Sequence, residues 1–173
     1  ERLDFGRDLH FQTATTTDTL DYTGSSLNHG SKLILAAAGV KRRNLRKDNS
    51  DLNSLELPGN FSHAKISMAG VVTIQWDGGK GTLRQKEIDE LKSSLVKWTF
   101  HENYPWVSIV NDSSDSFLWQ TFTRSDPAQD IYGLNERIEN KHWAVEPPII
   151  VDATIKERHQ EVLSVDSSVK QSA

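Results

Sequence analysis

Apolar residues in this sequence gather in short runs that polar turns separate. Four runs occupy residues 32–38, 64–75, 106–110 and 149–151. The last three are rich in β-branched residues, which is typical of strands inside a buried sheet. The Asp77-Gly78-Gly79 turn closes the longest run. The first run is too short for periodicity to distinguish a buried strand from a helical turn.

Two helices are expected between these strands. In the first helix, the apolar residues have the spacing of a single helical face: Ile88, Leu91, Leu95 and Trp98. Its other face is expected to be solvated and carries Lys86, Glu87, Glu90 and Lys92. Thr82 and Gln85 have the spacing of a capping box, which predicts a helix start at Thr82. A second helix is expected over 117–122, in a region that ends at Pro127.

Strands alternating with amphipathic helices predict an α/β fold, a layered domain with a mixed, partly parallel β-sheet flanked by helices. Residues 1–30 are interpreted as irregular with one short strand, and 41–60 as a surface loop. The sequence after Val162 is interpreted as a frayed polar tail. A single core is expected to contain Ile88, Leu91, Leu95, Trp98, Trp106 and Trp119.

Composition narrows the class of protein. The chain has 173 residues, which suits one domain, and its net charge of −4 argues against a general nucleic-acid binder. It has no cysteine, so disulfides, cysteine zinc sites and thiol nucleophiles are excluded. No apolar run approaches the length of a membrane span. The N-terminus lacks both signal-peptide character and an initiator Met, so we expect a processed chain or part of a longer one.

Three groups of residues suggest ligand chemistry, but each has a simpler explanation. Gly78, Gly79 and Gly81 precede a helix as a phosphate cradle would, although a turn is the favoured interpretation. Oxygen ligands for a divalent cation are offered by Asn111, Asp112 and Asp115, although helix capping explains the same residues. The basic run 41–47 suggests a phosphate patch or a solvated loop face. The six histidines lack the spacing of a helical zinc site.

The most distinctive segment runs from Phe117 to Asp130. Arg124, Asp126 and Asp130 are placed to form an ion-pair network just beyond the end of a helix. Such a network usually has a structural role, so the residues alone predict a domain without an identifiable catalytic set.

This segment resembles the C-terminal domain of UbiD-type decarboxylases. The family pattern T-R-x-D-P-A-x-D matches residues 123–130, and a strand and an acidic loop precede it at 107–115. A stretch similar to the family's G-H-A-K begins at His63 and includes Lys65, with Ser62 in place of the usual Gly. A strand ending in D-A-T matches 150–154. Asn111 and two serines make the acidic loop less acidic than in the family, which weakens a metal site there.

The resemblance implies a longer enzyme. It implies a reversible carboxy-lyase acting on an aromatic or α,β-unsaturated carboxylic acid. Prenylated FMN, a divalent metal (Mn or Mg) and potassium would be bound in a catalytic split-barrel domain of the same protein. No catalytic, cofactor-binding or metal-binding residue is carried over to this chain. His63, Lys65, Arg124, Asp126 and Asp130 are candidates for a structural or interface motif.

The domain organisation follows from this resemblance. Residues 1–62 are expected to be an N-terminal extension or a poorly placed part of the same domain, 63–160 the α/β core, and 161–173 a polar tail. The chain is expected to be a lid or assembly domain, cytoplasmic, in a homo-oligomer, without nucleic-acid or membrane partners. The alternative is a stand-alone α/β binding or protein-interaction module without catalysis.

Overall fold

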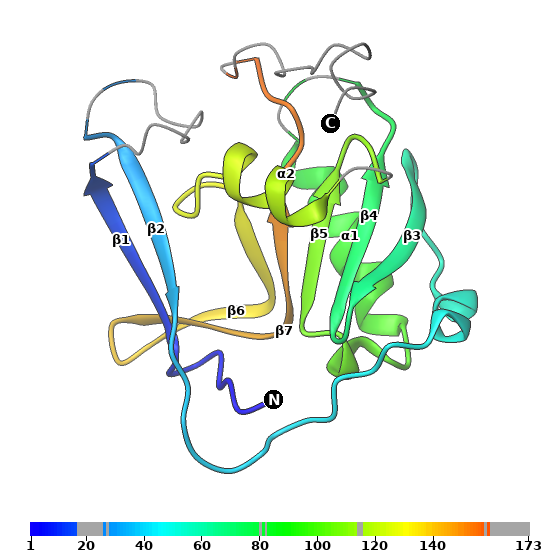
Figure 1. Ribbon diagram of the computed structural model, residues 1–173, viewed down its shortest axis with the longest axis horizontal. Helices are drawn as coiled ribbons and strands as arrows, with labels where there is room; N and C mark the ends of the chain where they lie inside the picture. The colour runs from blue at the N-terminus through cyan, green and yellow to red at the C-terminus, as the bar shows by residue number, and fades with distance from the viewer. Residues whose placement is uncertain are drawn as a thin grey trace, which may run out of the picture.

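A mixed five-stranded sheet forms the centre of the molecule, and a separate two-stranded hairpin stands beside it (Figure 1). The computed structural model describes residues 1–16, 26, 28–79, 81, 83–113, 116–157 and 159. Its elements are β1 (Leu9–Thr15), β2 (Gly30–Leu35), the 3₁₀-helix η1 (Asn49–Ser54), β3 (Phe61–Met68), β4 (Val71–Trp76), α1 (Gln85–Lys97), the 3₁₀-helix η2 (His101–Asn103), β5 (Trp106–Val110), α2 (Phe117–Arg124), β6 (Ile131–Glu139) and β7 (His142–Asp152).

The strand order of the large sheet is β3-β4-β5-β7-β6. β4 pairs with β5 and β5 with β7 in parallel, whereas β3 and β6 pair antiparallel with their neighbours at the two edges. The predicted α/β fold with a mixed, partly parallel sheet is therefore confirmed. No helix in the described part of the chain is long and apolar enough to cross a bilayer.

Helix α1 covers one side of the sheet and forms the larger core. Its predicted apolar face is confirmed, because Ile88, Leu91 and Leu95 have no exposed surface and Trp98 almost none. These side chains pack on alternate residues of the strands, as period-two strand geometry requires. The strand residues in this cluster include Val72, Ile74, Val107, Ile109 and Ile150.

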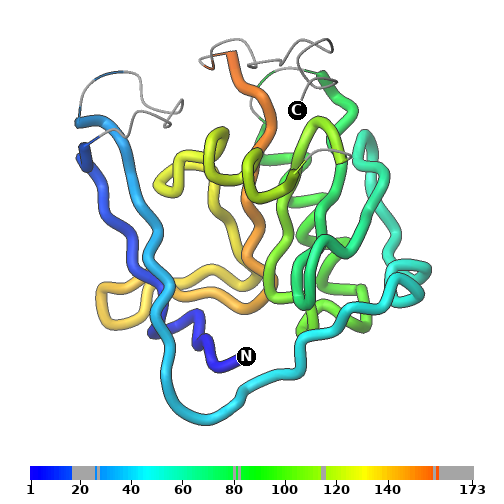
Figure 2. Tube along the Cα trace, viewed as in Figure 1, coloured from blue at the N-terminus to red at the C-terminus, as the bar shows by residue number. Residues whose placement is uncertain are grey.

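A second cluster lies on the opposite side of the sheet and is built partly by the N-terminal segment. Phe5 and Leu9 pack there on Val145 and Ile149 of β7. Phe11 of β1 makes an edge-to-face contact with Trp143, with ring centroids 5.3 Å apart. The chain then passes from the hairpin around one end of the sheet to η1 (Figure 2). Residues before position 62 thus contact the sheet directly, while the proposed boundary at 62 stays a prediction.

The structure corrects the predicted strands. The run 64–75 is not one strand but the β3–β4 hairpin, which turns at Ala69 and Gly70, where Gly70 has a φ of +78°. The run 32–38 contributes to β2, but the strand is largely exposed rather than buried. Strand β5 matches its prediction, and β7 extends well upstream of 149–151 through a cis Pro147–Pro148 bond. The polar strand β6 was not predicted.

The start of α1 also differs from the prediction. Arg84, rather than Thr82, is the N-cap, and Thr82 lies outside the described residues. The Glu87 carboxylate accepts the Arg84 backbone N–H at 3.0 Å and its Nε–H at 2.9 Å. These hydrogen bonds hold the pKa of Glu87 below its usual range. Glu87 is therefore buried, although it was expected on the solvated face.

Candidate functional site

Helix α2 carries the distinctive segment and lies across the side of the sheet opposite α1 (Figure 1). It begins after Ser116, whose Oγ accepts the Trp119 N–H at 3.5 Å. The Thr121 Oγ1 lies 3.1 Å from the Ser108 Oγ of β5, which joins the helix to the middle of the sheet. Gln120 donates from Nε2 to the Asp112 carbonyl at 2.8 Å. The predicted helix is thus confirmed and is fixed by polar contacts.

The inner face of α2 is polar and its outer face is apolar, which reverses the usual arrangement. Its buried residues are Gln120, Thr121, Thr123 and Arg124. On the outer face, Leu118 is 48% exposed, Trp119 46% and Phe122 73%. Trp119 was expected in the core and is not there. Its outward position follows from the inward hydrogen bonds of the polar side chains.

The residues after α2 form a closed polar turn. The Asp126 N–H donates to Asp130 Oδ2 at 2.7 Å, and the Asp130 N–H donates to the Asp126 carbonyl at 2.8 Å. Ser125 Oγ donates to the Thr121 carbonyl, and Gln129 Nε2 donates to Asp126 Oδ2 at 2.7 Å. Both aspartates are buried. Their role in this turn is to satisfy its backbone groups.

Strand β2 is tied to the same turn. Ser31 Oγ donates to Asp126 Oδ1, and the Ala128 N–H donates to Ser31 Oγ at 2.9 Å. Residues far apart in the sequence therefore hold one another in place here, and the hairpin becomes part of the site.

Lys156 completes the buried network, and sequence reasoning missed it. Its Nζ lies 3.4 Å from Asp130 Oδ2 and 3.4 Å from Asp152 Oδ2, with all three side chains buried. The same ammonium donates to the carbonyls of Asp152 at 2.9 Å, Arg124 at 3.3 Å and Thr154 at 3.3 Å. It therefore ties the end of α2 to the end of β7. The sequence signal was Lys156 four residues after the D-A-T aspartate.

Arg124 and Asp130 were predicted to share one ion-pair network with Asp126. Arg124 is buried and donates from Nη1 to Gln120 Oε1 at 2.9 Å. Asp130 forms an ion pair with Lys156. Both side chains are buried, and the role of this motif, structural or at an interface, stays a prediction.

The carboxylates of this network affect a neighbouring tyrosine. Burial, followed by the nearby charges of Asp152, Asp130 and Glu136, raises the pKa of Tyr132 to about 12. The Tyr132 phenol therefore stays protonated throughout the physiological pH range.

The other two candidate residues lie on β3, at the edge of the sheet. His63 is exposed and has a φ of +46° at an irregular position in the strand. Lys65 pairs in register with Thr73 of β4, and Thr73 pairs with Ser108 of β5. Residues that pair in register share a face of the sheet, so Lys65 lies on the side that α2 covers. The structure thus brings Lys65 onto the same face as α2.

The acidic loop and the basic run, which suggested ligand chemistry, make contacts within the domain or include residues outside its described part. Asn111 Oδ1 accepts the Ile155 N–H at 2.5 Å, and Asp115 is not among the described residues. The arginines of the basic run bind protein groups: Arg42 pairs with Asp4 at 2.7 Å, and Arg46 with Asp51 at 2.6 Å.

The glycines that suggested a phosphate cradle include one position without room for a side chain. A Cβ on Gly78 would lie 2.0 Å from the Trp76 ring. A turn packed this closely needs glycine for steric reasons, which agrees with the favoured interpretation.

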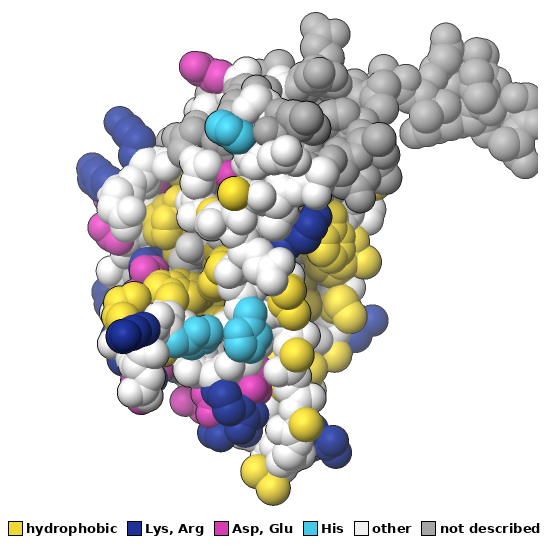
Figure 3. All heavy atoms as spheres, turned by 90° about the vertical axis from the view of Figure 1, so that its left-hand side faces the viewer, with side chains coloured by type: hydrophobic (Ala, Val, Ile, Leu, Met, Phe, Trp, Pro, Cys, Tyr) yellow, Lys and Arg dark blue, Asp and Glu magenta, His cyan; other side chains and the backbone are white. Residues whose placement is uncertain are grey.

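The described residues do not fit the metal that the resemblance implies. Among them, no group of three or more His, Asp or Glu side chains could hold a metal ion. Two histidines, His10 of β1 and His142 of β7, lie together with ring centroids 5.6 Å apart, and Figure 3 shows histidine side chains side by side on the hairpin side. A histidine pair without a carboxylate is not the oxygen-rich site that Mg²⁺ prefers.

Comparison with known proteins gives a consistent family. The family model described as the 3-octaprenyl-4-hydroxybenzoate carboxy-lyase C-terminal domain matches residues 1–37. An uncharacterised protein of Chlamydia trachomatis is 32% identical over 98% of this chain. A Chlamydia pneumoniae protein, named as a subunit of 4-hydroxybenzoate decarboxylase, is 32% identical over 99% of it. The chain spans 28% of the length of both relatives.

A solved structure is also similar. It is the Sedimentibacter hydroxybenzoicus vanillic acid decarboxylase, with 17% identity and a TM-score of 0.37, and the likeness covers 60% of this chain and 25% of that one. The family match lies in the segment that sequence reasoning placed poorly, and the chlamydial relatives cover the rest of the chain. These matches support a C-terminal domain of the UbiD family.

Proposed function

We propose that this chain is the C-terminal lid or assembly domain of a reversible, non-oxidative decarboxylase. The substrate class would be aromatic or α,β-unsaturated carboxylic acids. The family match and the name of the Chlamydia pneumoniae relative support a carboxy-lyase. Because that relative is named as a subunit, a partner domain or chain is supported as well. A cytoplasmic location and a homo-oligomer belong to the same proposal.

The observation that carries this assignment is the internal use of the family's polar motif. Asp126, Asp130 and Lys156 are buried and bonded to groups of the domain itself. A catalytic acid or base must come within hydrogen-bond reach of its substrate. These side chains instead fix α2 and its turn, so the motif supports a structural part of an enzyme.

Catalytic residues and cofactors would then belong to the rest of the protein. Prenylated FMN, Mn or Mg and potassium would be bound in the catalytic split-barrel domain, as the family resemblance implies. We assign no step of the reaction to the described residues.

The test compares the whole protein with this chain alone. The full-length protein, reconstituted with prenylated FMN, is expected to release CO₂ from 4-hydroxybenzoate or a cinnamic acid. Residues 1–173 alone are expected to bind no flavin and to release no CO₂. Activity or flavin absorbance in the isolated chain would contradict a lid or assembly role.

The second candidate is a stand-alone interaction module, and the exposed apolar side chains of α2 favour it as well. The length of the encoded protein separates the two. A reading frame as long as those of the chlamydial relatives supports the enzyme, whereas one that encodes little beyond these residues supports the module.

A further inference from the structure

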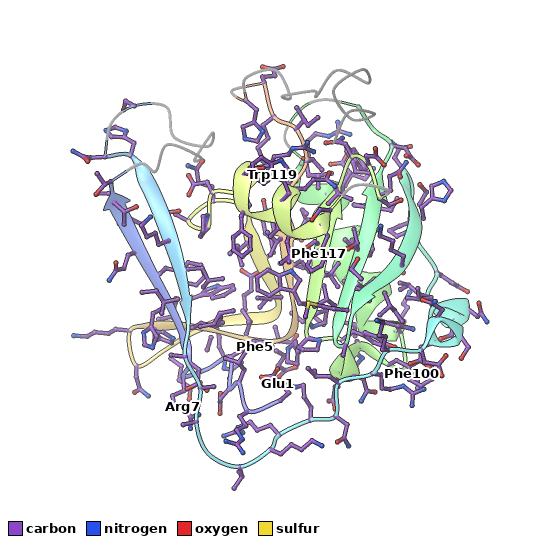
Figure 4. The ribbon with its side chains drawn as sticks, viewed as in Figure 1. Glu1, Phe5, Arg7, Phe100, Phe117 and Trp119 are labelled. Atoms are coloured by element: carbon purple, nitrogen blue, oxygen red, sulfur yellow. The ribbon has the colours of Figure 1, made fainter. Side chains whose placement is uncertain are left out.

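The two helices present opposite surfaces to their surroundings. The outer side of α1 carries charged residues such as Lys86 and Glu90, which form an exposed pair at 3.7 Å. The outer side of α2 carries Leu118, Trp119 and Phe122 instead. Figure 4 shows Phe117 and Trp119 on the side of the sheet that faces the viewer, and hydrophobic side chains follow the corresponding right-hand edge of Figure 3. The charged outer side of α1 is well solvated, whereas the apolar outer side of α2 favours contact with another protein surface.

The sheet beside α2 carries polar side chains on the same side, among which Thr73 is fully buried. Helix α2 packs on β5 and β7. The Ser67 and Thr73 hydroxyls lie 2.6 Å apart there. Gln75 Oε1 accepts the Ser113 hydroxyl at 3.1 Å. Lys65, which is half-buried, adds a positive charge on this side of the sheet, next to the apolar ridge of α2.

Helix α2 cannot bury its apolar ridge by rotating within the domain. Its inner side is held by the hydrogen bonds of Gln120 and Thr121 and by the Lys156 ammonium on the Arg124 carbonyl. Rotation would break these contacts and leave buried polar groups without partners, which costs about 1–3 kcal/mol for each group. The ridge therefore needs a partner from outside the described domain.

We infer that the α2 ridge docks against the remainder of the same polypeptide. This inference rests on the proposed function and names the surface through which the domain joins the enzyme. This chain accounts for 28% of the length of its chlamydial relatives, so a protein of that length would contain further segments that can cover the ridge. The positive charge of Lys65 on the same side of the sheet further predicts that the docking partner presents a carboxylate.

The test measures the reactivity of single cysteines in the full-length protein. Phe122 on α2 and Ile138 on β6 are matched in exposure, at 73% and 74%. Phe122→Cys and Ile138→Cys are each labelled with a maleimide. The labelling rate of each folded variant is divided by the labelling rate of the same variant unfolded in urea. Val96→Cys on the outer side of α1 is a second control. Because the natural segment has no cysteine, the labelled peptide is identified by mass spectrometry.

Phe122→Cys is expected to react at least about tenfold more slowly than both controls, because labelling follows the fraction of time that a site is open. Equal rates at all positions would overturn the inference. So would protection of Phe122→Cys that disappears on about 100-fold dilution, because a second copy would then be the occupant. Docking and the proposed function are tested separately. If Phe122→Cys is protected but the protein has no decarboxylase activity, the proposed function is wrong and the docking surface still holds.

Discussion

Lys156 offers the sharpest test of how this domain is held together. Its ammonium is the counter-ion of two buried carboxylates, Asp130 and Asp152, each 3.4 Å away. Lys156→Met keeps an unbranched apolar side chain of similar shape and removes the charge. Both carboxylates would then be left buried side by side, and three carbonyls would lose a donor.

The size of the effect follows from these distances. At an effective dielectric constant of about 20, Coulomb's law gives about 5 kcal/mol for each pair at this separation. Much of that attraction offsets the desolvation of three charged groups. Removing one partner of a buried pair usually destabilises a protein by about 3–5 kcal/mol, and we expect that loss for Lys156→Met. A domain of this size has about 5–15 kcal/mol of stability in total, so the variant would be marginal.

Urea titration followed by tryptophan fluorescence measures the loss, with Lys86→Met as the matched control. Lys86 pairs with Glu90 at 3.7 Å on the exposed face of α1 and should contribute about 0.5 kcal/mol or less. Asp130→Asn combined with Lys156→Met should cost less than the sum of the single changes, because the residues share one network. A loss below about 1 kcal/mol for Lys156→Met would refute the argument that this network holds α2 to β7.

Three further outcomes are expected. Trp98→Ala should destabilise the domain by about 3–5 kcal/mol and Trp119→Ala by less than about 1, because Trp98 is 1% exposed and Trp119 is 46% exposed. Urea titration measures both losses of stability, and losses of similar size would contradict the packing. Gly133→Ala should cost about 1–3 kcal/mol, since a Cβ would lie 2.5 Å from Val145, and an unchanged melting temperature would contradict this. The free energy of unfolding should fall between pH 10 and about 12, because Tyr132 ionises more readily in the unfolded chain than in the folded one. Tyr132→Phe should reduce this dependence of stability on pH, and an unchanged dependence would contradict the prediction.

Sequence patterns predicted the elements whose burial is one-sided and apolar. The face of α1 is an example, because Ile88, Leu91, Leu95 and Trp98 repeat with helical spacing and meet the sheet. Strand β5 was equally clear. In both cases local periodicity and tertiary burial agree, so no information from elsewhere in the chain is needed.

The missed elements depend on distant partners. Strand β6 is mostly exposed and polar, and it is defined by pairing with β7 rather than by its composition. The turn between β3 and β4 was missed because Ala69-Gly70 is a weak turn signal inside an apolar run. In both places tertiary pairing decides the structure.

The candidate site shows the same division. The segment around Arg124, Asp126 and Asp130 was found from its unusual sequence, and its turn was expected. Lys156 could not be assigned, because its contact with Asp130 brings together residues from different elements. Trp119 was placed in the core by a rule that expects apolar side chains inside, and α2 violates that rule.

The packing of the N-terminal segment on β7 has a consequence for synthesis on the ribosome. Phe5 and Leu9 emerge from the ribosome well before their partners Val145 and Ile149. Until then, these apolar side chains lack their native neighbours on β7. The domain therefore cannot complete its fold while it is being made, and contacts this distant in sequence slow folding and prolong exposure of aggregation-prone surface. Nascent chains arrested before β7 should consequently bind chaperones at the N-terminal segment, whereas chains extending past residue 152 should release them.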